Sequence, residues 1–504
     1  MEKKREYFFV LTRGVSDILD FVRGFLLINI LGGAFGTEIF GTWGLIEQIY
    51  SVAVIVAGLG LSQSVIRYLT GEHKAVYIRR VFLLSSTLIL VLGLLLTFLM
   101  YLAAQWIDAS IIKTDVALVC LKAALPLIVL NALELLLDGT YRARLRIDVH
   151  SLVRMFYTAL TLGAYLYARK MDYDLAGIIR LVLGIKFGYV LILYLLFALL
   201  EFPEKVGKKM ESGADAEFAL PHDQPALPAL KGMLIFGAPL MMFSLSNWLL
   251  TGGKVILGFQ TGAGEAGRYD ASLKIAMLLQ YLGMPIVYTL LPLLAEAVSK
   301  KGREAVYEVC RRFARLYFFL ALPLFFGLLA TQGLILDVLT GKEAFHTSML
   351  FFVLPLLAAV VSQVNAFYHN VIFLKGNSRF LFAANLCSAL FCVALNVLLT
   401  RWLGMYATAI ASLLSYLLLI AFCALRVRSY GFDPLKFLDL AFAARCGLVS
   451  LLMFAAVVLG LRLLPLEGIA KLICLGALGS VVYFAVSLAV KKFSLGEFLK
   501  ELTD

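Results

Sequence analysis

Long apolar runs separated by short polar segments dominate the chain. A helix that spans a membrane needs about 20 mostly apolar residues, and windows of that length recur along the whole sequence. They predict spans over residues 7–32, 39–62, 81–106, 115–138, 150–168, 175–200, 232–258, 268–296, 313–338, 347–372, 379–400, 405–425, 441–463 and 467–490. We therefore expect an all-α integral membrane protein with about 14 transmembrane helices.

The positions of basic residues predict how these helices are oriented. Lys and Arg concentrate in alternate loops, such as those with Arg79 and Arg80 or with Arg142 and Arg146, whereas the intervening loops hold few basic residues. Basic loops stay on the cytoplasmic side of a membrane. Both termini are therefore expected to be cytoplasmic, and an even number of spans agrees with that orientation.

The chain also contains an internal repeat. The match pairs Ile30-Leu31-Gly32, Gly36 and Gly41 with Ile256-Leu257-Gly258, Gly262 and Gly267 at one constant offset. Six predicted helices separate equivalent points, so both halves enter the membrane in the same direction, as in transporters built from parallel repeats. We predict an N-terminal lobe over 1–200, a cytoplasmic linker over 201–230, a C-terminal lobe over 231–430, and two additional helices with the C-terminal tail over 431–504.

Composition supports a membrane protein and argues against nucleic-acid binding. Hydrophobic residues make up 62% of the chain and charged residues 15%, with a mean hydropathy of +0.91, whereas soluble domains average about half apolar and a quarter charged. The net charge is +12, but the basic residues lie between apolar runs instead of forming one face. That pattern fits anionic lipid headgroups and no nucleic acid.

Motifs for catalysis and metal binding are missing from the sequence. The stretch Gly252-Gly253-Lys254-Val255 lacks the other residues of a phosphate-binding loop, the histidines form no HExxH, and the seven cysteines form no CxxC. The predicted external loops are also too short to hold a catalytic domain. We therefore predict a transporter rather than an enzyme, with no metal and no cofactor other than a coupling ion, Na⁺ or H⁺.

The first predicted helix carries four charges. Arg13, Asp17, Asp20 and Arg23 lie within an arc of about 120° and cover about 15 Å of depth. Four such charges facing lipid would cost about 10 kcal/mol, so they must face protein or water. One interpretation is self-neutralisation through the pairs Arg13–Asp17 and Asp20–Arg23. The other is that the helix lines a water-filled cavity, where Arg23 is the sharpest candidate for a phosphate contact.

Further charges lie inside other predicted spans. Through the repeat, Glu47 falls beside the counterpart of Lys274, which predicts either an ion pair between the lobes or a substrate contact. Lys254 and Lys122 could instead extend to the membrane interface, and Lys186 lies deep in a helix that could be peripheral. The candidate substrate-binding residues are Arg13, Arg23, Lys122, Lys254 and Lys274, and the candidates for ion coupling or charge pairing are Asp17, Asp20, Glu47, Glu134 and Asp270.

Several of these segments together resemble a known family. The chain resembles polysaccharide flippases of the multidrug, oligosaccharidyl-lipid and polysaccharide exporter superfamily. The resemblance rests on the two halves, the two extra helices and three segments: the run from Ile30 to Trp43, the stretch Ala57-Gly58-Leu59-Gly60-Leu61 and the following Ile66-Arg67-Tyr68. O-antigen flippases of lipopolysaccharide synthesis belong to this group. Members often carry an acid where this chain has Gly58, so the role of that acid is not carried over.

The resemblance implies a V-shaped pair of six-helix lobes around a cationic cavity. The implied cargo is an oligosaccharide on a polyprenyl diphosphate, moved from the cytoplasmic to the external leaflet by alternating access. Arg13, Arg23, Lys254 and Lys274 would then contact the diphosphate or acidic sugars. The implied location is a bacterial or archaeal cytoplasmic (inner) membrane. The partners would be the lipid-linked oligosaccharide and membrane lipids, the protein is expected to be a monomer, and cooperation with other membrane proteins of polysaccharide assembly stays open.

Other functions remain as alternatives. A flippase for the peptidoglycan lipid precursor shares the 14-helix plan. A cation-coupled multidrug exporter would show fewer cationic side chains in its cavity and usually 12 helices. A membrane glycosyltransferase is disfavoured by the short external loops, and a non-transporting scaffold leaves the charges of the first helix unexplained.

Overall fold

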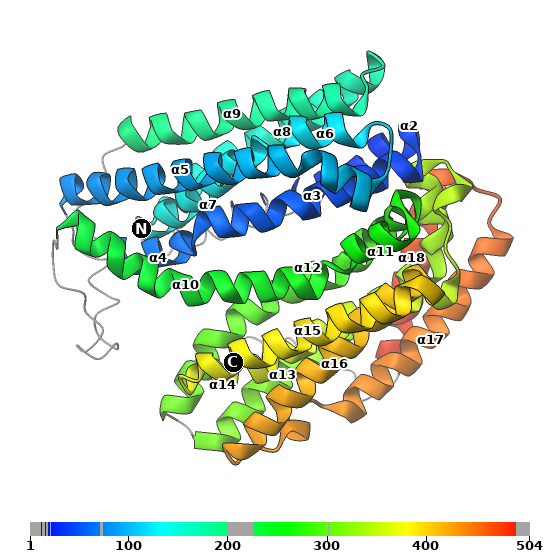
Figure 1. Ribbon diagram of the computed structural model, residues 1–504. Helices are drawn as coiled ribbons and strands as arrows, with labels where there is room; N and C mark the ends of the chain where they lie inside the picture. Colours follow the sequence, from blue (N-terminus) through cyan, green and yellow to red (C-terminus); the bar gives the residue numbers. More distant parts are fainter. Residues whose placement is uncertain are drawn as a thin grey trace. The chain divides into compact units, whose positions relative to one another are not determined.

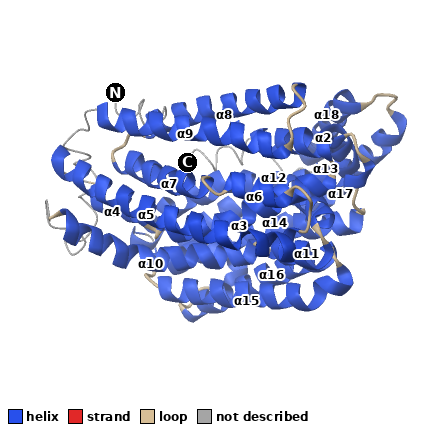
Figure 2. Ribbon diagram, turned by 45° about the horizontal axis from the view of Figure 1, so that its top comes forward, coloured by secondary structure: helices blue, strands red, loops and turns tan. Residues whose placement is uncertain are grey.

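Every regular element in the described part of the protein is a helix. The computed structural model describes residues 12, 16, 19–20, 22–70, 74–199, 225–300 and 302–489, and no strand occurs among them (Figures 1 and 2). Twelve candidate membrane spans are found in these residues by length and composition. The prediction of an all-α, multi-pass membrane protein is confirmed.

Two predicted spans are not among those twelve. Helix α8 (Ile147–Lys170) is long enough to cross a bilayer, but polar residues interrupt its apolar sequence. The first predicted span is described only in part, as the short apolar helix Val22–Phe35 with a π-helical turn, η1 (Ile28–Gly32), and the turn α2 (Gly33–Phe35). With these two, the described helices account for the predicted 14.

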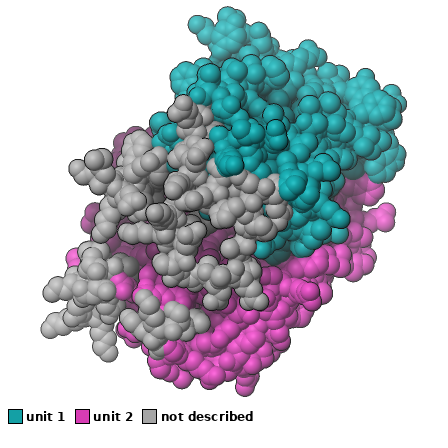
Figure 3. Space-filling view, turned by 90° about the vertical axis from the view of Figure 1, so that its left-hand side faces the viewer, with its two compact units in different colours: residues 1–248, 262–264 teal, residues 249–261, 265–504 magenta. Residues whose placement is uncertain are grey.

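The contacts within the chain divide it into two compact units, coloured separately in Figure 3. Unit 1 comprises residues 1–248 and 262–264, and unit 2 comprises residues 249–261 and 265–504. The division falls near the end of α10 (Ala226–Thr251), so this helix packs mainly with unit 1. By the repeat, however, α10 is the first helix of the second half. The predicted lobe boundaries and the V shape stay predictions.

Unit 1 contains the helices of the first half together with α10. The described helices after α2 are α3 (Thr37–Gly58), α4 (Leu61–Leu69), α5 (Ala75–Ile107), α6 (Ala117–Ala124), α7 (Leu127–Ala143), α8 and α9 (Leu175–Leu199). Helices α3 and α4 form one candidate span, Thr37–Leu69, which extends beyond the predicted 39–62 and breaks where Leu59 and Gly60 adopt left-handed conformations. Helices α6 and α7 form another, interrupted before Pro126 because proline lacks the backbone N–H that a continuous helix needs.

Unit 2 contains the second half and the two additional helices. Its elements are α11 (Gly253–Thr261), α12 (Ala263–Lys300), α13 (Gly302–Thr340), α14 (Met349–Leu374), α15 (Ser378–Leu403), α16 (Met405–Ser429), α17 (Leu440–Leu463) and α18 (Gly468–Ala489). Gly252 separates α10 from α11, which form one predicted span. Helices α17 and α18 pack against α13 through an apolar cluster that includes Met453 and Tyr483.

The sequence repeat has a counterpart in backbone geometry. Gly36 precedes α3 with a φ of 91°, and Gly262 precedes α12 with a φ of +97°. Both lie at matched positions of the repeat and make the same connection between the first and second helices of a half. Glycine is needed there because a side chain strains the backbone at such angles.

Many large apolar side chains are exposed on the helices. Examples are Trp402 at 83% exposed and Leu199 at 77%. In a soluble protein such surfaces would promote aggregation, whereas in a bilayer they contact lipid of the same polarity. The interior of each unit therefore holds the polar residues that the lipid cannot solvate.

Candidate functional site

The first ion cluster lies inside unit 1. We call it the unit 1 cluster and define it as Asp20, Arg23, Glu134, Arg154 and Lys186. These residues come from the first helix, α7, α8 and α9. Helix α8 contributes Arg154 because its polar positions recur at helical spacing and face the other helices of the unit. The same polar positions make α8 less apolar than the neighbouring helices.

Asp20 is the centre of one half of the unit 1 cluster. Its carboxylate forms an ion pair with Arg154 and accepts a hydrogen bond of 2.7 Å from the Thr158 hydroxyl. The Arg23 guanidinium lies 3.5 Å from the same carboxylate and 5.5 Å from the centre of the Tyr157 ring. The predicted Asp20–Arg23 pair therefore forms, but Asp20 also has a cation from another helix.

Lys186 and Glu134 form the other half of the unit 1 cluster. The Lys186 ammonium donates to the Glu134 carboxylate, and Lys186 is only 5% exposed. The same ammonium lies 5.0 Å from the centre of the Tyr157 ring and 5.4 Å from that of Tyr189, and these two rings stack. The depth expected for Lys186 agrees with the structure: the side chain is buried in unit 1, where α9 packs against α8 and α7.

The residues that define the unit 1 cluster include more cations than carboxylates. Arg23, Arg154 and Lys186 provide three cations, and Asp20 and Glu134 provide two carboxylates. Arg23 is the most exposed of the cations, with 29% of its side chain accessible against 22% for Arg154 and 6% for Lys186. Arg23 is therefore the cation of this cluster that is most accessible to solvent.

The second ion cluster lies inside unit 2. We call it the unit 2 cluster and define it as Lys254, Asp270 and Lys274. The Lys254 ammonium donates to Asp270 Oδ1 at 2.8 Å, and the Lys274 ammonium lies 3.2 Å from Asp270 Oδ2. Two cations therefore face the same carboxylate.

The geometry of Lys254 decides between the two interpretations of this residue. Lys254 is 7% exposed and bonded to a carboxylate that is itself 2% exposed. An extended side chain that reaches the membrane interface is therefore wrong for Lys254. The attraction of a buried carboxylate outweighs hydration at the interface because few other groups can solvate either charge.

The remaining sequence candidates are placed as follows. Lys122 lies over the ring of Tyr101, 4.8 Å from its centre, so the contact that the structure gives it is aromatic. Within unit 1, and among the described residues, Glu47 has no ion-pair partner. A contact between Glu47 and Lys274 stays a prediction. Arg13 and Asp17 lie outside the described residues.

One member of the unit 1 cluster, Arg154, and the adjacent Tyr157 were not predicted from the sequence. Arg154 lies near the start of a predicted span and was not chosen among the charges inside spans, and Tyr157 has no charge to mark it. A usable signal exists, because Arg154, Tyr157, Thr158 and Thr161 form a polar stripe at helical spacing in an otherwise apolar segment. Lys186 was noticed but not selected.

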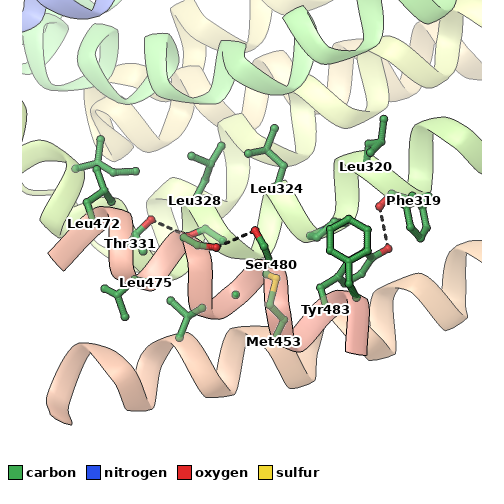
Figure 4. A pocket seen from close by; sticks show the side chains of 17 residues that line it. Phe319, Leu320, Leu324, Leu328, Thr331, Met453, Leu472, Leu475, Ser480 and Tyr483 are labelled. Atoms are coloured by element: carbon green, nitrogen blue, oxygen red, sulfur yellow. Dashed lines mark hydrogen bonds between the residues drawn. The ribbon is translucent and has the colours of Figure 1, made fainter. Parts of the chain in front are cut away.

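An apolar pocket of about 420 Å³ lies elsewhere in unit 2, between α13, α17 and α18 (Figure 4). Its polar side chains are turned to the backbone: Thr331 donates to Gly327 O, Ser480 to Gly476 O and Tyr483 to Phe319 O. The pocket thus offers no cation to a charged group.

Comparisons with known proteins agree with a transporter. The family described as polysaccharide biosynthesis protein matches residues 35–349. No curated protein sequence matches the chain. The structure of lipid II flippase MurJ in an inward closed conformation is similar to this chain with a TM-score of 0.70 and 14% identity, over 96% of this chain and 99% of that one.

Two further solved structures have the same fold. An inward-facing multidrug resistance MATE family transporter of the MOP superfamily has a TM-score of 0.64 and 13% identity, over 82% of this chain and 95% of that one. A MOP superfamily transporter from Pyrococcus furiosus has a TM-score of 0.52 and 15% identity, over 86% of this chain and 97% of that one. Since the family match covers more than half of the sequence, the chain belongs to the polysaccharide biosynthesis protein family, with the fold of the MurJ and MATE transporters.

Proposed function

We propose that the protein is a flippase that moves a polyprenyl-diphosphate-linked oligosaccharide from the cytoplasmic to the external leaflet by alternating access. The observation that carries the proposal is the presence of cationic side chains in the interior of each unit, among them Arg23 in the unit 1 cluster and Lys274 in the unit 2 cluster. Buried cations in membrane-spanning segments are costly and mark the path of a charged solute. A diphosphate is attracted by such cations, whereas a cationic drug is repelled.

A second cargo is favoured by one specific observation. The likeness to the lipid II flippase MurJ extends over 96% of this chain, whereas the likeness to the inward-facing MATE transporter extends over 82%. The peptidoglycan lipid precursor is therefore the alternative cargo. Both lipids carry an acidic headgroup, so the ion clusters suit either one, and the two have to be compared directly.

The test is translocation in proteoliposomes. The purified full chain is reconstituted with a fluorescent polyprenyl-diphosphate oligosaccharide or, separately, with the labelled peptidoglycan precursor, and arrival in the opposite leaflet is measured. We expect the oligosaccharide to move, and Arg23→Ala and Lys274→Ala each to slow it at least about tenfold, the effect of losing one charge-assisted contact.

Lys375→Ala is the matched control for these two variants. Lys375 is an exposed lysine just after α14, so its loss changes the net charge by the same amount without touching either cluster. We expect wild-type translocation from it. Unchanged rates in both Arg23→Ala and Lys274→Ala would show that the clusters are not the headgroup site, and movement of the peptidoglycan precursor alone would select the alternative cargo.

We further propose that Glu47 is the coupling carboxylate for Na⁺ or H⁺. Asp20, Glu134 and Asp270 are held by lysine or arginine, which leaves them poorly suited to bind a cation. Glu47 is half-buried on α3. Glu47→Gln should abolish the dependence of translocation on a Na⁺ or H⁺ gradient, and a gradient dependence equal to wild type would reject this assignment.

Location and orientation complete the proposal. We place the protein in a bacterial or archaeal cytoplasmic membrane with both termini on the cytoplasmic side, acting as a monomer. Single cysteines introduced into a cysteine-free chain at Asp172 and Tyr430 test the orientation. The first follows α8 and the second follows α16. An impermeant maleimide should label the first only from outside and the second only after permeabilisation, and the reverse pattern would invert the topology.

A further inference from the structure

Helix α14 carries a polar face that contains no carboxylate, lysine or arginine. Five polar side chains lie within an arc of about 160° and extend over about 12 Å along the helix. They are Ser362, Gln363, Asn365, His369 and Asn370, and we call them the α14 polar face. Three of the five are amides, which both donate and accept hydrogen bonds.

The centre of the α14 polar face is accessible. Ser362, Gln363 and His369 are half-buried, and so is Ala366, which lies between them and adds only a methyl group. An amide that contacts lipid tails finds no hydrogen-bond partner there, which costs several kcal/mol. The accessible part of this face is therefore expected to contact water or a polar solute rather than lipid.

The two asparagines of the face have unused hydrogen-bonding atoms. Asn365 is 8% exposed and Asn370 is 7% exposed. Among the described residues, no group donates to Asn365 Oδ1 and no group accepts from Asn370 Nδ2. Most buried polar atoms in proteins have a partner, and one without a partner costs about 1–3 kcal/mol. One acceptor and one donor are thus left for a group that can both donate and accept.

Helix α12 borders the same face. The Gln280 amide donates to the Ser362 hydroxyl at 3.4 Å, and that hydroxyl donates to the Ala359 carbonyl at 2.8 Å. One turn beyond Gln280, a Cβ added to Gly283 would lie 2.7 Å from Gln363 Oε1. The Gln363 amide therefore lies against α12 at a position where glycine leaves room for it. Amides from two helices thus meet in one region of unit 2.

We propose that the α14 polar face binds sugar rings of the transported headgroup, with Gln363 and Asn365 as direct contacts. The inference rests on the proposed function in that the cargo carries sugar. A sugar hydroxyl donates one hydrogen bond and accepts others, so it matches the amides of this face. A phosphate is attracted instead by the cations of the two ion clusters. Sugar and phosphate are thereby recognised by different residues.

A purely structural role of the face predicts a different effect on stability. Polar side chains also hold membrane helices together, and the loss of such a side chain lowers the free energy of unfolding. Asn365→Leu replaces the amide by an apolar group of similar size. Because Asn365 Oδ1 has no partner among the described residues, we expect the thermal unfolding temperature of this variant in detergent to be unchanged or higher.

The direct test is the binding of a neutral trisaccharide to the full chain in lipid nanodiscs. The probes are maltotriose and tri-N-acetylchitotriose, and titrations followed by saturation-transfer NMR give their affinities. We expect at least one to bind the wild type, and Asn365→Leu and Gln363→Met each to weaken this binding about fivefold, the effect of one lost neutral hydrogen bond. Gln105→Met is the matched control and should bind like the wild type, because Gln105 is an exposed glutamine on α5 in unit 1.

Inorganic pyrophosphate, titrated calorimetrically into the same nanodiscs, separates the sugar site from the ion clusters. Asn365→Leu and Gln363→Met should bind pyrophosphate with the affinity of the wild type. Arg23→Ala should lower the affinity for pyrophosphate about tenfold and leave the affinity for the trisaccharide unchanged. A fold disturbed as a whole would instead lose both ligands together.

The outcomes separate this inference from the proposed function. Absence of trisaccharide binding to the wild type, equal affinities in the wild type and both variants, or a parallel loss of trisaccharide and pyrophosphate would each overturn the sugar site. If Asn365→Leu does not fold, Gln363→Met decides alone. If the trisaccharide affinities follow the expectation but no lipid-linked oligosaccharide moves in proteoliposomes, the sugar site stands and the proposed cargo is wrong.

Discussion

Gly60 and Gly237 meet backbone to backbone inside unit 1. A Cβ added to Gly60 would lie 2.2 Å from the Gly237 carbonyl oxygen, and a Cβ added to Gly237 would lie 2.5 Å from the Leu59 carbonyl oxygen. The contact joins the break between α3 and α4 to α10. Beside it, the Ser64 hydroxyl donates to the Met233 carbonyl at 2.9 Å. Close approach of two helices through glycine is a common way to stabilise helix pairs in membranes, where the hydrophobic effect contributes little.

Gly237→Ala should therefore destabilise the protein by about 2 kcal/mol, because the added methyl has no space in a contact between backbones. Thermal unfolding in detergent measures the loss. Gly58→Ala is the control, since its Cβ would meet no atom within 4 Å and alanine is the better helix former. Equal stability of Gly237→Ala and wild type would mean that α10 does not pack on unit 1 in this way.

Lys186→Met should cost about 3 kcal/mol, because it leaves the Glu134 carboxylate buried without its main partner. The double variant Glu134→Gln with Lys186→Met removes both charges and should recover most of that loss. The double-mutant cycle, followed by thermal unfolding, gives the coupling energy. A coupling energy near zero would show that the two side chains do not form a buried pair.

Gly262→Ala isolates the cost of backbone geometry in the repeat. Its φ of +97° is unfavourable for alanine, yet no atom lies within 4 Å of the added Cβ. We expect a loss of about 1–3 kcal/mol from strain alone, and a similar loss for the equivalent Gly36→Ala. Gly264→Ala is the control, because its nearest contact is an ordinary 3.8 Å to Thr37. Tolerance of both substitutions would argue against a shared strained connection.

Asp439 should make stability depend on acid pH. Burial raises the pKa of Asp439, but hydrogen bonds from the Phe442 backbone N–H and from Arg315 together outweigh burial and hold the pKa below its ordinary value. The folded state therefore favours the charged carboxylate. The charged form adds to the free energy of unfolding at pH values above the pKa of Asp439 in the unfolded chain, near 4. This stabilisation is lost as the pH falls through the lower pKa of Asp439 in the folded protein.

The measurement is thermal unfolding between pH 7 and pH 3. Asp439→Asn should be less stable than wild type by up to about 1 kcal/mol at pH 7, because asparagine still caps α17 but forms no ion pair with Arg315. The difference between the two proteins should shrink towards pH 3. A constant difference across this range would show that Asp439 does not contribute through its charge.

The helices were predictable because each apolar run needs lipid or protein as its solvent. The expected span 81–106 lies within α5, and the expected span 379–400 lies within α15. Both helices are longer than the expected spans because they continue beyond the apolar segment. The breaks within spans were not predicted. Leu59 is an apolar residue in an apolar run, and its left-handed conformation follows from the packing around Gly60, which no local pattern reveals.

The candidate site was predictable only as a set of charges. Asp20 and Arg23 share a helix, so their pairing follows from spacing alone, and Lys254 and Asp270 were identified as charges in apolar segments. The partners from other helices were not. Arg154 reaches Asp20 across unit 1, and Lys254 bonds to Asp270 on the next helix. Spacing along the chain says nothing about contacts between helices.

The sequence by itself determined the class of protein, the number of helices and the repeat. The length of each apolar run is set locally by the solvent that the helix needs, and glycine at Gly36 and Gly262 is required by the local backbone conformation. Only the tertiary structure decided which charges pair. A buried carboxylate takes whichever cation the packing of helices brings within reach, and in both clusters that packing assigns two cations from different helices to the same carboxylate.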